Sequence, residues 1–128
     1  GDVSTPERAK DCFDRYGVDA IMVGRATFGC PWIFEDMKHY LETGELLPQR
    51  DMAWCVGILK EHVLRSIAWI GDERKGIVHS RRHFAASPVF KGLPDFKQTR
   101  IALLRAETRD EVFRIMDEIV ERYGGLEI

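Results

Sequence analysis

The chain has 128 residues, of which 45% are hydrophobic and 31% are charged, and its formal net charge is −2. This length and apolar content allow one domain or two small subdomains with a real core, and the near-neutral charge excludes a uniformly basic nucleic-acid binder. No apolar run approaches the roughly 20 residues that cross a bilayer, so we expect a cytoplasmic protein without a membrane partner.

The N-terminal third of the chain is predicted to form a helix, a strand and a second helix. A helix start at Thr5 and a helix stop at Gly17 bound an amphipathic segment. Residues 20–23 are apolar at every position, which is typical of a strand buried on both faces in a parallel sheet. A second helix is predicted from Pro31 to about Gly44. This order of elements is typical of an α/β barrel or a doubly wound sheet.

The predicted strand has no visible partner in the sequence. A buried strand needs neighbours because its backbone N–H and C=O groups must be paired. We therefore expect residues 20–23 to pair with another copy of the chain, to rearrange, or to be poorly ordered. Self-association through this segment is one of these outcomes.

Four helices are predicted in the rest of the chain. Asp51 caps a long helix whose apolar residues keep the three–four spacing until Gly71. A second helix covers residues 73–86, a third covers roughly residues 97–107, and the capping box "TRDE" opens a last one. Short links between them predict a compact four-helix unit over residues 51–124. The fold class is therefore mainly α.

Two glycine-containing pairs are candidate phosphate loops. They are Gly1-Asp2 and Gly24-Arg25, and the second follows the predicted strand directly. Loops at the carboxyl ends of parallel strands favour anions because free backbone N–H groups and helix dipoles meet there. Gly24 would let the backbone approach a phosphate and Arg25 would neutralise its charge. The alternative is that Gly24 only turns the chain and that Arg25 is a solvated loop residue.

Basic residues are concentrated between Arg74 and Arg105, where eight lysines and arginines accompany one acid. This segment carries +7 and the rest of the chain carries −9. On a helix, Lys75, His79 and Arg82 lie at positions i, i+4 and i+7 and therefore line one stripe. Such a stripe suits phosphate oxygens and predicts an RNA or DNA surface. The alternative is a solvated helix face, and His83 could equally be a packed, hydrogen-bonded histidine. The candidate nucleic-acid residues are Lys75, His79, Arg81, Arg82, His83, Lys91 and Arg100.

The larger aromatic residues are interpreted as core residues. Base stacking is the alternative for Trp32, Trp54, Trp69, Phe90 and Phe96, but large aromatic side chains more often fill a core.

The three cysteines are far apart and lack CxxC or CxxH spacing, which predicts reduced thiols and no metal site. No nucleophile lies beside an obvious base, so no catalytic residue is assigned.

The blocks "GVDAIMVGRATFGCPWIF", "HSRRHFAASPVFKGLP" and "TRIALL" resemble the C-terminal part of bacterial tRNA-dihydrouridine synthases of the B-like branch. The resemblance covers nearly the whole chain. It implies that residues 1–47 are the last βα elements of a TIM barrel and that residues 48–128 are a helical tRNA-binding domain. In this family NADPH reduces FMN, and the flavin then reduces a uridine of tRNA to dihydrouridine with a barrel cysteine as proton donor.

The resemblance also assigns roles to individual residues. It implies that Gly1, Asp2, Gly24 and Arg25 belong to the FMN phosphate site. Cys30 stands where the family often has asparagine, and none of the three cysteines matches the catalytic one. The earlier barrel strands, which serve NADPH and the flavin ring, are absent. We therefore expect a fragment that binds tRNA, binds FMN weakly or not at all, and is inactive alone.

Two alternatives remain open at this point. The first is a stand-alone helical RNA-binding module without a redox role. The second is a protein-interaction bundle whose basic face is incidental. The strand and the phosphate-like loop favour the synthase interpretation, because a free-standing bundle has no use for the segment "IMVGRA".

Overall fold

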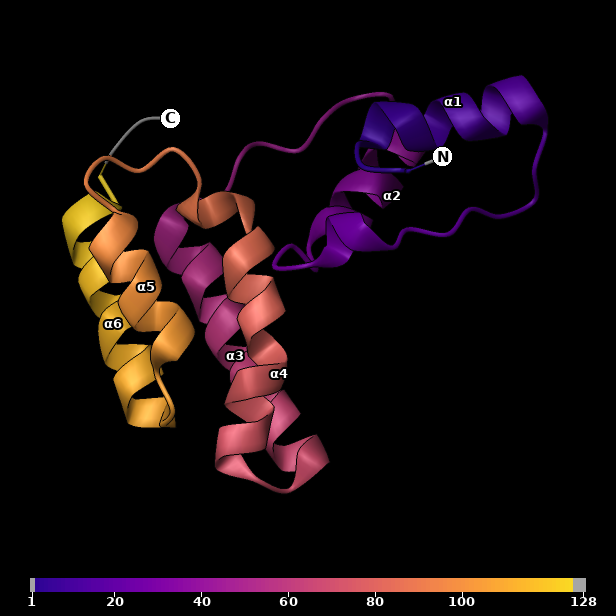
Figure 1. The fold of residues 1–128 in the computed structure, drawn as a ribbon. Helices are drawn as coiled ribbons and strands as arrows, with labels where there is room; N and C mark the ends of the chain where they lie inside the picture. The colour runs from indigo at the N-terminus through magenta and orange to yellow at the C-terminus, as the bar shows by residue number, and fades with distance from the viewer. Residues whose placement is uncertain (1, 126–128) are drawn as a thin grey trace. The chain divides into compact units, whose positions relative to one another are not determined.

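The computed structural model describes residues 2–125, and these residues form helices and no strand. The chain divides into an N-terminal unit (Gly1–Gln49) and a C-terminal unit (Arg50–Ile128), drawn as ribbons in Figure 1. The mainly α fold class is thus confirmed. No helix in the described part of the chain has both the length and the apolar character needed to cross a membrane.

The N-terminal unit is built from two helices, α1 (Pro6–Tyr16) and α2 (Ile33–Thr43), and a short 3₁₀ helix, η1 (Arg25–Thr27). The side chain of Thr5 accepts a hydrogen bond from the backbone N–H of Arg8 at 3.1 Å, which fixes the start of α1. Gly17 ends α1 in the left-handed conformation, with φ of 61°, where glycine carries no steric penalty. Both ends of α1 are therefore as predicted.

The predicted strand at residues 20–23 does not form. This segment is irregular, with Ile21 and Val23 half-buried against the small core of the unit and Met22 87% exposed. The described residues contain no neighbouring strand with which this segment could form backbone hydrogen bonds, so its backbone stays irregular. In α2, Ile33 and Met37 are buried in this core, whereas Phe34 is 54% exposed.

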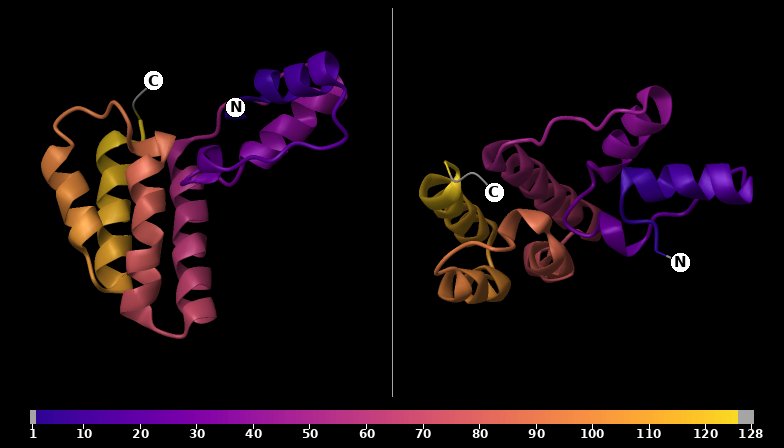
Figure 2. Two further views of the ribbon diagram at one scale, coloured as in Figure 1. Left: turned by 45° about the vertical axis from the view of Figure 1, so that its right-hand side comes forward. Right: turned by 90° about the horizontal axis from the view of Figure 1, so that it is seen from above.

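The C-terminal unit is a four-helix bundle, which confirms the compact four-helix prediction. Seen from above in Figure 2, α3 to α6 lie near the corners of a square, and each contacts two others. The Asp51, Asp72 and Thr108 side chains each accept a backbone N–H at the start of a helix. Besides a short 3₁₀ helix, η2 (Pro88–Phe90), the elements are α3 (Met52–Ile70), α4 (Glu73–Ala86), α5 (Lys97–Arg105) and α6 (Arg109–Tyr123).

Most of the bundle core consists of apolar residues that the three–four spacing of the helices selects. Leu59 and Val63 of α3, Ile77 of α4, and Met116 of α6 are fully buried. α3 and α4 approach so closely at Gly76 that a Cβ atom built there would lie 2.7 Å from the Cα of Ile67. The α3–α4 hairpin is therefore the most tightly packed pair in this unit.

An aromatic cluster closes the end of the bundle where α6 ends. Tyr123 packs edge-on against Phe96 with ring centroids 5.8 Å apart, and its hydroxyl donates a hydrogen bond to the Pro94 carbonyl at 2.6 Å. We expect Tyr123→Phe to lower the free energy of unfolding by about 1 kcal/mol, because the ring packing stays and this hydrogen bond is lost. Urea unfolding measures this loss of stability: the midpoint should fall while the m-value stays unchanged.

Tyr16→Phe is the matched control, since Tyr16 is exposed on α1 in the other unit and should leave the midpoint unchanged. An equal midpoint for Tyr123→Phe and the wild type would contradict the stabilising role of the hydroxyl.

Candidate nucleic-acid interface and phosphate loop

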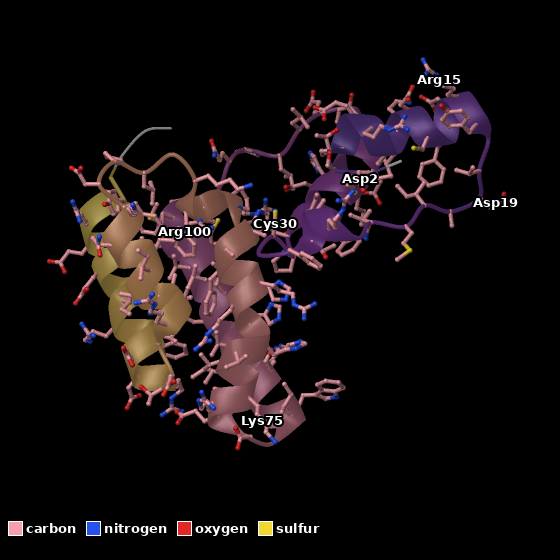
Figure 3. The ribbon with its side chains drawn as sticks, in the orientation of Figure 1. Asp2, Arg15, Asp19, Cys30, Lys75 and Arg100 are labelled. Carbon is pink, nitrogen blue, oxygen red and sulfur yellow. The ribbon has the colours of Figure 1, made fainter. Side chains whose placement is uncertain are left out.

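One face of α4 carries a basic surface depression of about 440 Å³, called here the α4 groove. It contains the predicted stripe of Lys75, His79 and Arg82, together with a further cation and two apolar side chains. Lys75 lies close to the turn that joins α3 and α4 (Figure 3). No carboxylate is among the residues that line the groove. These residues are Ile70, Arg74, Lys75, Val78, His79 and Arg82.

Two acids, Glu73 and Glu107, flank the basic segment of residues 74–105 in the sequence. The Glu73 carboxylate accepts the backbone N–H of Arg109 at 3.2 Å, and Glu107 forms an ion pair with Arg74 at 3.4 Å. Both carboxylates therefore serve the packing of α4 against the start of α6. The charged residues of the groove lining are therefore all basic, and Glu107 balances the charge of one of them, Arg74.

Three histidines gather between α3 and α4 beside the groove. The rings of His62 and His83 lie 4.2 Å apart between centroids. Burial, together with the neighbouring His62, Arg82 and His79, lowers the pKa of the His83 imidazole to about 4. Burial and His79 also lower the pKa of His62 below its ordinary value. His83 is thus neutral and half-buried at pH 7, which agrees with the packed-histidine alternative.

The depressed pKa of His83 makes the stability of the bundle depend on pH. The folded value is about 4 and the unfolded value about 6.5, so between these values the unfolded state binds the proton more readily. We expect the melting temperature to fall as the pH drops from 7 towards 4.5, and His83→Gln to reduce this fall. His39→Gln, in the other unit, is the matched control. An identical pH profile for wild type and His83→Gln would contradict the linkage.

Four of the predicted nucleic-acid residues lie outside the lining of the groove. Arg81 donates to the Ala106 carbonyl, and Arg100 donates to the Ala85 carbonyl, each at 3.2 Å. These two half-buried guanidiniums therefore bridge neighbouring elements of the bundle. Lys91 is exposed directly after η2, and His83 packs as described above.

The predicted phosphate loops meet in the N-terminal unit. Asp2, Gly24 and Arg25 all line a depression of about 320 Å³, and the Arg25 guanidinium forms an ion pair with the Asp2 carboxylate. The hydrogen bond from Arg25 holds the pKa of Asp2 below its usual value. A Cβ atom on Gly24 would meet open space, so a ligand can reach the backbone there. Gly1 lies outside the described residues.

One residue of the α4 groove, Arg74, was not predicted as a site residue. Arg74 belongs to the basic segment, and it lines the groove one turn from Val78.

The aromatic residues that were interpreted as core residues differ in their exposure. Trp69 is 84% exposed and Trp54 is 41% exposed, so their interpretation as core residues is wrong, whereas Phe90 and Phe96 are buried as predicted. A signal existed for Trp69, because the apolar spacing of α3 passes through positions 67 and 70 and skips 69.

Comparisons with known proteins match nearly the whole chain to one family. The dihydrouridine synthase (Dus) family model matches residues 1–122. The tRNA-dihydrouridine synthase B of Shewanella oneidensis is 35% identical over 125 residues, which are 94% of this chain and 38% of that protein. The corresponding proteins of Pseudomonas aeruginosa and Salmonella typhimurium are 41% and 42% identical over 83 residues, or 65% of this chain.

The chain thus spans about two fifths of the Shewanella protein, and the matches to the Pseudomonas and Salmonella proteins cover 25% and 26% of those relatives. The agreement of the family model and the curated relatives confirms the resemblance to the B-like branch. The chain belongs to the dihydrouridine synthase family.

Proposed function

We propose that this chain supplies the tRNA-binding part of a tRNA-dihydrouridine synthase, an FMN-dependent enzyme that uses NADPH to reduce uridine to dihydrouridine in tRNA. The observation that carries the proposal is the α4 groove. Arg74, Lys75, His79 and Arg82 line one depression that contains no carboxylate. The curated relatives, whose names specify tRNA, match the segment that contains these residues.

Such a groove suits the phosphates of a folded RNA. The Arg82 guanidinium can hold two phosphate oxygens at once, while Lys75 provides a mobile point charge. Phosphate contacts position an RNA without reading its bases, so the groove contributes affinity and orientation. Selection of the target uridine then belongs to other parts of the enzyme.

The salt dependence of tRNA binding tests this proposal. Two cations of the groove, Lys75 and Arg82, would displace about two counterions, because Arg74 is paired with Glu107. The affinity for labelled tRNA should then fall roughly seven- to twelve-fold between 50 and 200 mM salt. Anisotropy titrations at the two salt concentrations measure it. Undetectable binding at 50 mM salt, or an affinity that does not change with salt, would contradict the proposal.

The depression in the N-terminal unit has room for the phosphate of FMN, and its cation, Arg25, is paired with Asp2. Gly24 leaves the backbone open to a ligand, and the five N–H donors of Arg25 allow it to hold an anion while it still contacts Asp2. When bound, FMN supplies the hydride that reduces the uridine. The residues Asp2, Gly24 and Arg25 would hold only the phosphate end of the cofactor.

We expect the 128-residue chain alone to bind FMN very weakly and to have no synthase activity. The phosphate contacts provide part of the binding free energy, whereas the flavin ring needs partners that this chain does not provide, and association costs entropy. Titration of FMN fluorescence measures this. A dissociation constant in the micromolar range would contradict the expectation.

The alternative of a stand-alone RNA-binding module is less well supported. The family model extends over the N-terminal unit as well as the bundle. A module without redox context would not require residues 2–49, with their phosphate-like loop, to match this family.

A further inference from the structure

An exposed tryptophan lies beside the α4 groove. Trp69 is 84% exposed, which leaves a large, flat apolar surface in water. It occupies the last turn of α3 and immediately precedes Ile70, which lines the groove. The chain then turns through Gly71 and Asp72 directly into α4. The indole therefore stands at the end of the hairpin where the groove lies.

Helix geometry places Trp69 on the same side of α3 as His62. The two residues are seven positions apart, which is close to two full turns of a helix. The His62 ring contacts His83 of α4, and His79 influences the pKa of both imidazoles. This side of α3 therefore lies next to the face of α4 that carries the groove. The indole and the groove cations share one surface of the α3–α4 hairpin.

We infer that Trp69 and the α4 groove together bind an unpaired nucleotide of RNA, with the base stacked on the indole and the flanking phosphates held by Lys75 and Arg82. This inference rests on the proposed function, which concerns only the phosphates. A cationic groove beside an aromatic platform is the arrangement that proteins use for single-stranded nucleic acid. The basic lining favours a polyanion over an apolar protein partner.

The inference distinguishes unpaired RNA from duplex RNA. Bases in a stem are stacked on one another and cannot reach an indole, whereas bases in loops and at ends are accessible. The preferred part of a tRNA would therefore be a loop or an unpaired end. Stacking tolerates every base, so we expect little sequence preference at this position.

Binding of a labelled eight-residue oligouridylate and of a twelve-base-pair RNA duplex tests the inference. Trp69→Ala should weaken oligouridylate binding about five- to 150-fold, the effect typical of losing one base–aromatic stack, and should leave duplex binding unchanged. Trp69→Phe should stay within about three-fold of wild type because a ring remains. The salt slope should be the same for all three proteins, since no charge is removed.

Leu64→Ala is the matched control. Leu64 is also an exposed apolar residue of α3, but five positions separate it from Trp69, which places it on another side of the helix. Its replacement should change neither RNA affinity. Oligouridylate should also quench indole fluorescence in the wild type, and Trp69→Phe should lose that quenching.

The outcomes separate this inference from the proposed function. If Arg82→Ala weakens RNA binding and Trp69→Ala does not, the stacking inference is wrong and the phosphate surface stands. Equal weakening of oligouridylate and duplex binding by Trp69→Ala would likewise overturn stacking. If the wild type binds neither tRNA nor oligouridylate, both proposals fail. Melting curves of Trp69→Ala and Trp69→Phe, which we expect to match the wild type, exclude loss of folding as the cause.

Discussion

Replacing Gly76 with alanine is expected to lower the free energy of unfolding of the bundle by about 3 kcal/mol, at the upper end of the usual cost of overpacking. The new Cβ would lie 2.7 Å from the Cα and 2.8 Å from the backbone nitrogen of Ile67. Backbone atoms cannot rotate away, so α3 and α4 must separate. That movement loosens the contacts of the buried Val63 and Ile77, and it outweighs the better helix propensity of alanine.

Gly57→Ala provides the matched control for Gly76→Ala. Gly57 also lies inside a helix, but a Cβ built there meets nothing within 4 Å. The same substitution should therefore raise the free energy of unfolding by about 0.5–1 kcal/mol, because only helix propensity changes. Urea unfolding of both variants measures the two opposite effects. A Gly76→Ala protein as stable as wild type would mean that the two helices do not approach this closely.

Replacing Arg82 with alanine is expected to weaken tRNA binding by about 1.5 kcal/mol, or roughly ten-fold. This is the low end for a lost hydrogen bond to a charged group, since Arg82 is exposed and its charge is partly screened by water. The slope of log Kd against log salt should fall by about one, because one phosphate contact disappears. The melting temperature should change little, as it does for most surface substitutions.

Two other arginines control for charge and for position. Arg114→Ala removes the same charge from the exposed face of α6, where Arg114 forms an ion pair with Glu118 at 3.0 Å, and should leave tRNA affinity unchanged. Arg81→Ala should instead lower the melting temperature, because Arg81 donates to the Ala106 carbonyl. An unchanged affinity and salt slope for Arg82→Ala would remove Arg82 from the RNA surface.

Most of the secondary structure could be predicted from the sequence because its determinants are local. The caps at Thr5, Asp51 and Thr108 bond to backbone groups three residues ahead, and the glycines at positions 17 and 71 end their helices within the same turn. The three–four spacing likewise fixes which face of a helix is apolar. Most of the buried residues of α3 and α6 lie at positions that this spacing selects.

The basic stripe of the candidate site was predictable for the same reason. Lys75, His79 and Arg82 share a face on any helix, so their common groove required only that α4 form. The roles of neighbouring residues were not predictable in this way. Arg81 and Arg82 are adjacent in sequence, yet one contacts the end of α5 and the other lines the groove, because the position of α5 decides which face of α4 is covered.

The sequence by itself determined the family, the helix boundaries, the apolar faces of the bundle and the cationic stripe, since each depends on residues a few positions apart. Tertiary structure alone decided the fate of residues 20–23 and the pairing of Asp2 with Arg25. A strand exists only with a partner strand, and an ion pair across 23 positions forms only when the chain folds back on itself. These features depend on contacts between distant segments, which no local pattern specifies.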